Sequence, residues 1–191
     1  AESHPDVVAA CAIHPTKARE LDDTARARLR EMAAHPKCVA IGETGLDTYW
    51  IRHRPDDTAP LAVQEEALRF HIDVAVAAGK ALMIHNREAD TDLLRVLGDA
   101  PSPKYTILHC FSSPTAVAKE AIARGYVLSF AGNVTFKNNE ELRQIAAMVP
   151  IDQLLIETDA PFMTPVPYRG AKNEPAFIGH TALCVAAARS M

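Results

Sequence analysis

Residues 39–44 read Val-Ala-Ile-Gly-Glu-Thr, a short run that is apolar until it ends in a carboxylate and a hydroxyl. A brief apolar run without alternation is typical of a parallel strand that is covered on both faces. The same character is found in five other segments: Val7–Ile13, Ala81–His85, Tyr105–Cys110, Tyr126–Phe130 and Leu154–Thr158. We therefore expect six parallel strands.

Helical patterns separate these runs. Apolar residues recur at helical spacing over residues 21–33, where Asp22 or Asp23 is a suitable N-terminal cap. Pro60 suits the first position of another helix, which Gly79 would end. Further helices are expected to open at Ser113-Pro114 and at Asn139. Strands that alternate with helices imply right-handed crossovers and a parallel sheet, either doubly wound or closed into a TIM barrel.

Two segments, 47–58 and 160–175, are expected to be long functional loops, and the second contains four prolines. Hydrophobic residues make up 48% and charged residues 23% of the 191 residues, which suits one globular domain. The balance of 20 basic against 24 acidic side chains argues against a broad basic surface that holds nucleic acid by charge alone. It does not exclude a nuclease whose site is made positive by metal ions.

The cysteines are few and far apart in the sequence, with no C-x-x-C pair. Neither a thiolate zinc site nor a disulfide framework is indicated, and reduced thiols in a cytoplasmic protein are the simplest interpretation.

No apolar run approaches the length of a membrane span, and no signal-peptide pattern opens the chain. We therefore expect no membrane partner.

Four of the expected strands end in a residue that can bind metal: Glu43, His85, His109 and Asp159. In a parallel barrel the carboxyl ends of all strands converge on one rim, where active sites lie. Two imidazoles and two carboxylates form a ligand set for Zn²⁺, Mn²⁺ or similar ions. Any one of these residues alone is as easily a loop cap or a buried polar group. All of them at equivalent positions favour a metal site.

Several stretches together resemble the TatD family of metal-dependent deoxyribonucleases, part of the amidohydrolase superfamily. They follow the family's order over about residues 7–178: Ala12-Ile13-His14-Pro15, Ile41-Gly42-Glu43-Thr44-Gly45-Leu46-Asp47, Met83-Ile84-His85-Asn86-Arg87, Leu108-His109-Cys110-Phe111-Ser112, Leu155-Ile156-Glu157-Thr158-Asp159-Ala160-Pro161 and the late loop from Arg169 to Pro175. The resemblance implies an α/β fold of the TIM-type (β/α) barrel, with six of its eight strand units in this chain. Residues 1–191 would then form a single partial (β/α)8-barrel hydrolase domain.

The resemblance also implies roles for the metal-binding residues. Glu43 would bridge two divalent ions (Mg²⁺, Mn²⁺ or Zn²⁺), and His85 and His109 would complete the site of the second ion. Asp159 would bind the first ion and act as base toward the attacking water, so that Asp159 and Glu43 are the expected catalytic residues. The implied reaction is hydrolysis of phosphodiester bonds in DNA, typically from the 3′ end.

Substrate-binding residues are less sharply indicated. His14 lies at a family motif near the site and would touch substrate or water, or else make a supporting hydrogen bond. Arg87 would hold a phosphate or form a structural ion pair with Asp47 or Glu157. Arg169 would contact the nucleic-acid backbone, or else be a solvated loop charge together with Lys172. Tyr49, Trp50 and Phe111 are able to stack on a base, although hydrophobic cover is the commoner role.

The sequence departs from the family pattern at its beginning. The family's first strand ends in His-x-His, and no His-x-His occurs in this sequence. Either these residues are part of a longer chain, which we favour because six strands do not close an eight-stranded barrel, or the protein is naturally shortened. Alternatives to a deoxyribonuclease are a related barrel that acts on another ester, lactone, aminoacyl ester or metabolic phosphoester, and an impaired remnant that only binds.

Overall fold

The computed structural model describes residues 1–191 and contains six strands with flanking helices. The strands whose pairing is described run parallel, which confirms the predicted α/β class. The chain forms two compact units, Ala1–Ile107 and Leu108–Met191, and each is described by itself. No helix has both the length and the hydrophobicity needed to cross a membrane.

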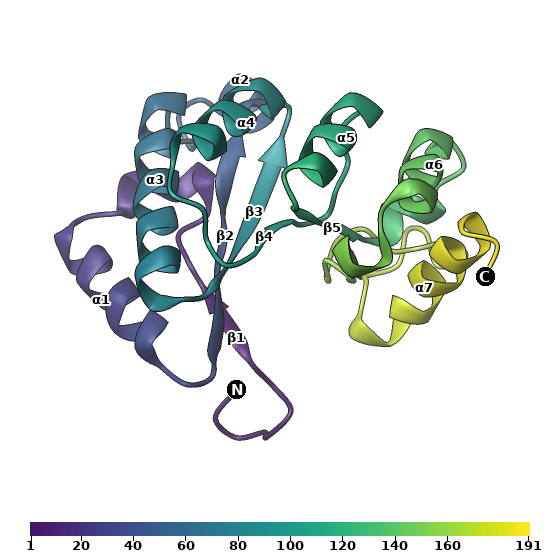
Figure 1. Ribbon diagram of the computed structural model, residues 1–191, viewed down its shortest axis with the longest axis horizontal. Coiled ribbons are helices and arrows are strands. Elements are labelled where there is room, and N and C mark those ends of the chain that lie inside the picture. Colours follow the sequence, from purple (N-terminus) through teal and green to yellow (C-terminus); the bar gives the residue numbers. More distant parts are fainter. The chain divides into compact units, whose positions relative to one another are not determined.

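The first unit is built on β1 (Ala9–Cys11), β2 (Cys38–Asp47) and β3 (Ala81–Arg87). Strand β2 pairs with both of the others in parallel, and its Gly45 lies opposite His85 of β3. The other elements are a 3₁₀ segment and four α-helices: η1 (Pro15–Glu20), α1 (Asp23–Ala34), α2 (Thr48–His53), α3 (Leu61–Ala78) and α4 (Asp90–Asp99). Helix α3 packs on β2 and also contacts α1, and these two helices cover one side of the strands (Figure 1).

Most of the predicted helix ends in this unit are confirmed. Asp22 caps α1 by accepting a hydrogen bond from the backbone N–H of Ala25 at 2.8 Å. Gly79 ends α3 in the left-handed region, with φ of 62°. Pro60 precedes α3 as its N-cap and is not its first helical residue, because its ψ of 155° is extended.

The expected loop over residues 47–58 is wrong in its first half, where the chain forms α2. The Asp47 side chain caps this short helix by accepting a hydrogen bond from the backbone N–H of Trp50 at 2.7 Å. An aspartate in the N-cap position is a helix start signal, and here it operates directly at the end of β2, although the Thr-Tyr-Trp-Ile that follows has weak helix propensity. The backbone therefore turns sharply where β2 leaves the sheet.

The core of the first unit is formed by the facing apolar sides of β2, β3 and α3. Its fully buried side chains include Ile41, Leu46, Leu68, Leu82 and Ile84. Burying a side chain of this size stabilises the fold by roughly 1.5–3 kcal/mol. This close-packed core fixes the positions of the strand ends that carry the polar residues.

A buried histidine joins the end of the first strand to α3. His71 has no exposed surface, its Nδ1–H donates to the carbonyl oxygen of Ala67 at 2.7 Å, and its Nε2 accepts from the backbone N–H of Ile13 at 3.1 Å. If Nε2 were protonated, its N–H would point at the backbone N–H of Ile13, and two hydrogen-bond donors would face each other. Burial accordingly lowers the pKa of His71 to about 4.

The stability of the fold is therefore expected to fall with acidification through the titration of His71. The unfolded chain takes up this proton near pH 6.5 and the folded chain only near the pKa of about 4, so stability is complete above pH 6.5 and is lost as the pH falls toward 4. At pH 5 the loss is about 2 kcal/mol relative to pH 7.5. Urea unfolding at the two pH values, with His71→Gln as the control that lacks this titration, measures it. A loss of the same size in His71→Gln would show that other groups are responsible.

The second unit contains β5 (Val127–Phe130) and β6 (Leu154–Ile156), which pair in parallel, and β4 (Thr106–Leu108) lies where the chain passes between the units. Its other elements are helices and 3₁₀ segments: α5 (Thr115–Ala123), η2 (Gly132–Thr135), α6 (Glu140–Met148), η3 (Ile151–Gln153), η4 (Pro175–Phe177) and α7 (Ile178–Ala188). Helices α6 and α7 pack side by side (Figure 1). The predicted helix starts after Pro114 and Asn139 are confirmed, and the backbone from 157 to 174 has no helix or strand, as expected for a long loop.

Candidate metal centre

Three polar side chains of the first unit meet at the carboxyl ends of its strands. They come from the segment after β1, from β2 and from β3: His14, Glu43 and His85. His85 Nδ1 lies 3.5 Å from Glu43 Oε2, and His14 Nε2 lies 4.0 Å from Glu43 Oε1. The two imidazole rings are in edge contact, with centroids 4.6 Å apart. His14, Glu43 and His85 are thus the predicted site residues that the structure brings together within the first unit.

This cluster fits a divalent metal ion. One ligand atom from each of the three side chains lies within 4.8 Å of those from the others. Two imidazoles with one carboxylate are a ligand set used by catalytic zinc sites, which keep a further position for water or substrate. The donor chemistry also suits Mn²⁺ and related ions.

The orientation of His85 is fixed by a carboxylate behind it. His85 Nε2 lies 2.9 Å from Oδ2 of Asp47, which has no exposed surface. Burial alone would raise the pKa of the Asp47 carboxyl, but the hydrogen bonds from His85 and from the Trp50 backbone outweigh it and lower that pKa. Asp47 is therefore an anion that accepts the Nε2 proton, and Nδ1 is the atom of His85 that can offer a lone pair.

The pKa of His85 itself is raised. Burial would lower it, but the hydrogen bonds to Asp47 and Glu43 stabilise the protonated ring by more. The same carboxylates that hold a proton on this ring also favour any other cation at Nδ1. This is the arrangement in which a carboxylate orients a metal-ligating histidine and increases its basicity.

Asp47 is in turn held by its own partners. Its backbone N–H donates to Oε1 of the buried Gln64 at 2.7 Å, and the Gln64 amide donates to the carbonyl oxygens of Ala59 and Asp47. Sequence reasoning noted Asp47 only as a partner for Arg87 and missed this role. The position of Asp47 could have indicated this role. Gly45 lies opposite His85 on the neighbouring strand, and Asp47 follows two residues later, so its carboxylate comes close to the His85 ring.

Removing the Asp47 charge should weaken metal binding without removing a ligand. In Asp47→Asn the buried carboxylate that fixes the His85 ring is neutral, and losses of this kind typically cost about 10- to 100-fold in metal affinity. Isothermal titration with Mn²⁺ or Zn²⁺ measures the change. Asp73→Asn, which changes an exposed carboxylate of α3, is the matched control and should bind as the wild type does. Equal affinities in all three proteins would contradict the orienting role of Asp47.

His14 is positioned through the turn that follows it. Its Nδ1 lies 2.8 Å from Thr16 Oγ1, and the ring acts as the N-cap of η1. The preceding Ile13 is tied to His71 in α3. The sequence placed His14 near the site as a substrate or supporting residue, and the structure adds it to the donor set of Glu43 and His85.

His109 and Asp159 lie in the second unit, where the structure shows the immediate partners of His109. His109 Nδ1 lies 3.3 Å from Glu157 Oε1. Glu157 also accepts hydrogen bonds from the Cys110 backbone N–H at 2.5 Å and from the Ser129 hydroxyl at 2.9 Å. Glu157 therefore contacts His109 in the way that Asp47 contacts His85, as a carboxylate that orients the imidazole ring. This role was not predicted from the sequence.

Asp159 follows β6 at the start of the long loop. Its backbone has φ of 54°, and its carbonyl oxygen accepts from the N–H of Phe162 at 2.8 Å. The side-chain amide of the buried Asn173 donates to the carbonyl oxygens of Thr158 and Phe162, on either side of Asp159. The far end of the loop therefore fixes the backbone that carries this carboxylate.

The tentative substrate-binding residues have local partners. Arg87 is exposed, makes no ion pair with Asp47, and stacks its guanidinium over Tyr49 at 3.7 Å. Arg169 lies over Phe136 at 3.8 Å and donates to the Thr164 carbonyl oxygen. Both cations are on the surface and reachable by a phosphate. Phe111 is buried beside Phe130, so its role is hydrophobic packing.

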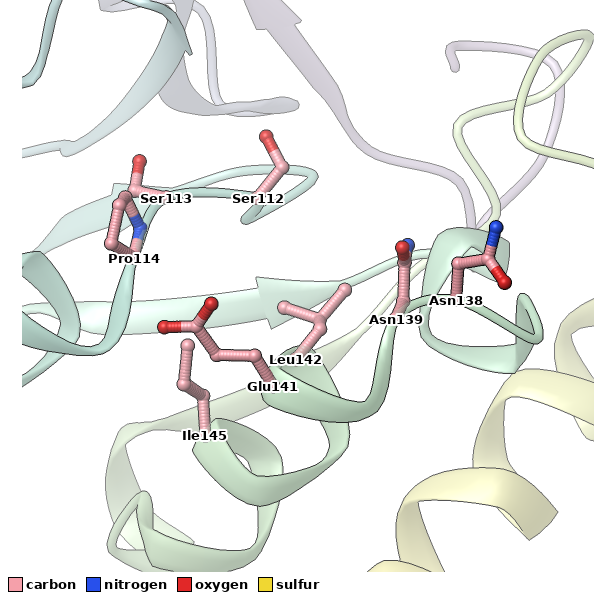
Figure 2. A pocket seen from close by; sticks show the side chains of 8 residues that line it. All are labelled: Ser112, Ser113, Pro114, Asn138, Asn139, Glu141, Leu142 and Ile145. Atoms are coloured by element: carbon pink, nitrogen blue, oxygen red, sulfur yellow. The ribbon is translucent and has the colours of Figure 1, made fainter.

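A cavity of about 280 Å³ in the second unit lies between the segment before α5 and the first turns of α6 (Figure 2). Glu141 is one of its lining residues, and its carboxylate accepts hydrogen bonds from the Thr115 backbone N–H at 2.9 Å and hydroxyl at 2.8 Å. These bonds lower the pKa of Glu141. The carboxylate caps α5 and occupies the position that an external anion would take at the start of this helix.

Comparison with known proteins agrees with this geometry. The family model "TatD related DNase" matches residues 1–191. The "Uncharacterized metal-dependent hydrolase TatD" of Mycobacterium tuberculosis is 49% identical over 180 residues, which cover 94% of this chain and 68% of that protein. The "Uncharacterized metal-dependent hydrolase YabD" of Bacillus subtilis is 37% identical over 100% of this chain and 72% of its own. The "3'-5' ssDNA/RNA exonuclease TatD" of Erwinia tasmaniensis is 33% identical over 99% of this chain and 73% of its own.

Solved structures show the same fold. The crystal structure of YjjV, a TatD homolog from Escherichia coli K12, superposes with a TM-score of 0.90 at 24% identity, over 100% of this chain and 72% of that one. A TatD family hydrolase from Entamoeba histolytica gives a TM-score of 0.80 at 21% identity, over 96% and 68%. The predicted TIM-type α/β fold is thereby confirmed.

Proposed function

This chain belongs to the TatD family of metal-dependent hydrolases, and on that premise we propose that it cleaves phosphodiester bonds of DNA as a 3′–5′ exonuclease. The observation that carries the proposal is the cluster of His14, Glu43 and His85, with the buried Asp47 behind it. The relative from Erwinia tasmaniensis, named as an exonuclease on single-stranded DNA and RNA, supports the choice of substrate.

The proposed ligands are Glu43, His85, His109 and Asp159, for two divalent ions in a complete site, and His14 joins them as a further donor. Glu43 and Asp47 place negative charge at the centre of the site, which disfavours the scissile phosphate there until a cation is bound. A bound divalent ion supplies the positive charge that attracts and polarises the phosphate and lowers the pKa of water. Asp47 and Glu157 keep the two imidazoles oriented while the substrate binds.

Asp159 is the proposed base. Its carboxylate takes the proton of the attacking water, as a positioned carboxylate does in general base catalysis. Asn173 contributes by fixing the backbone on both sides of this residue. Arg87 and Arg169 are proposed to hold phosphate oxygens, since each offers an exposed guanidinium on an aromatic support.

The test is cleavage of a single-stranded oligonucleotide labelled at its 5′ end, with Mg²⁺, Mn²⁺ or Zn²⁺ and with EDTA. The proposal expects a ladder of products shortened from the 3′ end that depends on the added ion. Parallel incubation with ester, lactone and aminoacyl-ester substrates covers the other hydrolase reactions. Turnover of one of these with intact DNA would replace the nuclease assignment, and no turnover of any substrate with tight DNA binding would indicate a binding protein.

A further inference from the structure

A second cavity lies in the first unit beside the candidate metal centre. Its volume is about 330 Å³, at the small end of the range of roughly 300–1,000 Å³ for ligand pockets. It is lined by residues of η1, of α2 and of the segment that follows α2: Thr16, Lys17, Trp50, Arg54, Asp57 and Thr58. We call it the Trp50 pocket.

Two walls of the Trp50 pocket are bonded directly to the candidate metal centre. On one side, Thr16 Oγ1 lies 2.8 Å from Nδ1 of His14. On the other, the Trp50 backbone N–H donates to Asp47, whose other carboxylate oxygen holds His85. A ligand in this pocket is therefore separated from His14 by Thr16 alone, and from His85 by Trp50 and Asp47.

The pocket is held together by hydrogen bonds between its own walls. The backbone N–H of Ala59 donates to the carbonyl oxygen of Thr16 at 3.0 Å, which joins the end of the segment after α2 to η1. The hydroxyl of the buried Thr58 donates to the carbonyl oxygen of Trp50 at 3.3 Å. The position of the Trp50 backbone is thus fixed from both ends of α2.

The chemistry of the lining suits a flat, uncharged ring next to an anion. Trp50 offers a half-buried indole whose ring centroid lies 5.2 Å from the Arg54 guanidinium and 5.4 Å from that of Arg87, so a base would stack on this ring by displacing one of these planar groups. Lys17 and Arg54 are exposed cations, while Asp57 adds a carboxylate. The carboxylate disfavours a phosphate within the pocket, whereas the two cations favour one at its edge.

We propose that the Trp50 pocket seats a base of single-stranded DNA next to the bond that is cut, with the base stacked on the indole and the adjoining phosphate near Lys17 and Arg54. The proposal rests on the proposed function and deepens it, because it names a residue that selects a nucleic-acid substrate over other phosphodiesters. Base–aromatic stacking of this kind is tolerant of sequence. The pocket therefore accounts for binding without base specificity.

Trp50 is the only tryptophan in the chain, so its fluorescence reports on the pocket directly. Titration with a short oligothymidylate in EDTA, which prevents metal-dependent cleavage, should quench this fluorescence to saturation. An abasic oligomer of the same length, which has the phosphates but no bases, should quench much less. Equal quenching by both oligomers, or none by either, would overturn the proposal whether or not the chain cleaves DNA.

A kinetic comparison separates stacking from a structural role of Trp50. Stacking is worth roughly 1–3 kcal/mol per base, which corresponds to about 5- to 150-fold in kcat/KM. Trp50→Ala should lose this factor on the oligothymidylate relative to the abasic oligomer, and Trp50→Phe should recover most of it. Equal losses on both oligomers would show that the indole has only a structural role and does not stack on a base. A wild-type chain that cuts neither oligomer but shows base-dependent quenching would reject the nuclease and retain the pocket.

Discussion

Asp159→Asn is expected to reduce the rate of DNA cleavage by about 1,000-fold or more while the protein stays folded. The substitution keeps the size of the side chain but removes the carboxylate that is proposed to bind a metal ion and take the proton of the attacking water. General base catalysis alone contributes about 10²- to 10⁴-fold, and loss of a charged metal ligand adds to this. The half-exposed position of Asp159 means that the change leaves no unpaired buried charge.

The measurement is the single-turnover rate on a labelled oligonucleotide at saturating metal, together with circular dichroism and thermal unfolding. Asp152→Asn is the matched control, because Asp152 is an exposed carboxylate of the same unit, in η3 just before β6. The control should cleave DNA at the wild-type rate. Cleavage by Asp159→Asn at that same rate would remove Asp159 from the mechanism.

Gly45→Ala is expected to destabilise the first unit by about 3 kcal/mol or more, or to prevent its folding. Gly45 lies in β2 with φ of 145°, and a Cβ at this position would lie 1.9 Å from the carbonyl oxygen of His85 in β3. The two strands would have to separate at the point from which Glu43 and His85 project. Metal affinity should therefore fall together with stability.

Gly79→Ala is the matched control for this prediction. Gly79 also has a positive φ, of 62°, but a Cβ there meets nothing within 4 Å. Only the cost of the left-handed conformation remains, roughly 1–2 kcal/mol. Urea unfolding of both variants compares the two costs. If Gly45→Ala were no less stable than Gly79→Ala, the close approach of β2 to β3 would not be needed for folding.

The sequence by itself determined the class of fold and most of the element ends. Apolar runs such as residues 81–85 and caps such as Asp22 and Gly79 are local features, because the hydrophobic period and the capping geometry depend on a few neighbouring residues. The candidate ligands Glu43 and His85 were accessible in the same way, as polar residues in otherwise apolar strands. Motif order was enough to place the chain in its family.

Only the tertiary structure decided how these residues are supported. That Asp47 holds His85, that Gln64 holds Asp47, and that His71 fixes the residue before His14 depends on the strand register and on how α3 packs. Arg87 illustrates the same limit, since its stacking on Tyr49 replaces the ion pair that its charge alone would suggest. A hydrophobic pattern states which side chains are buried, but the partners of a buried polar atom are set by the three-dimensional packing of residues distant in the chain.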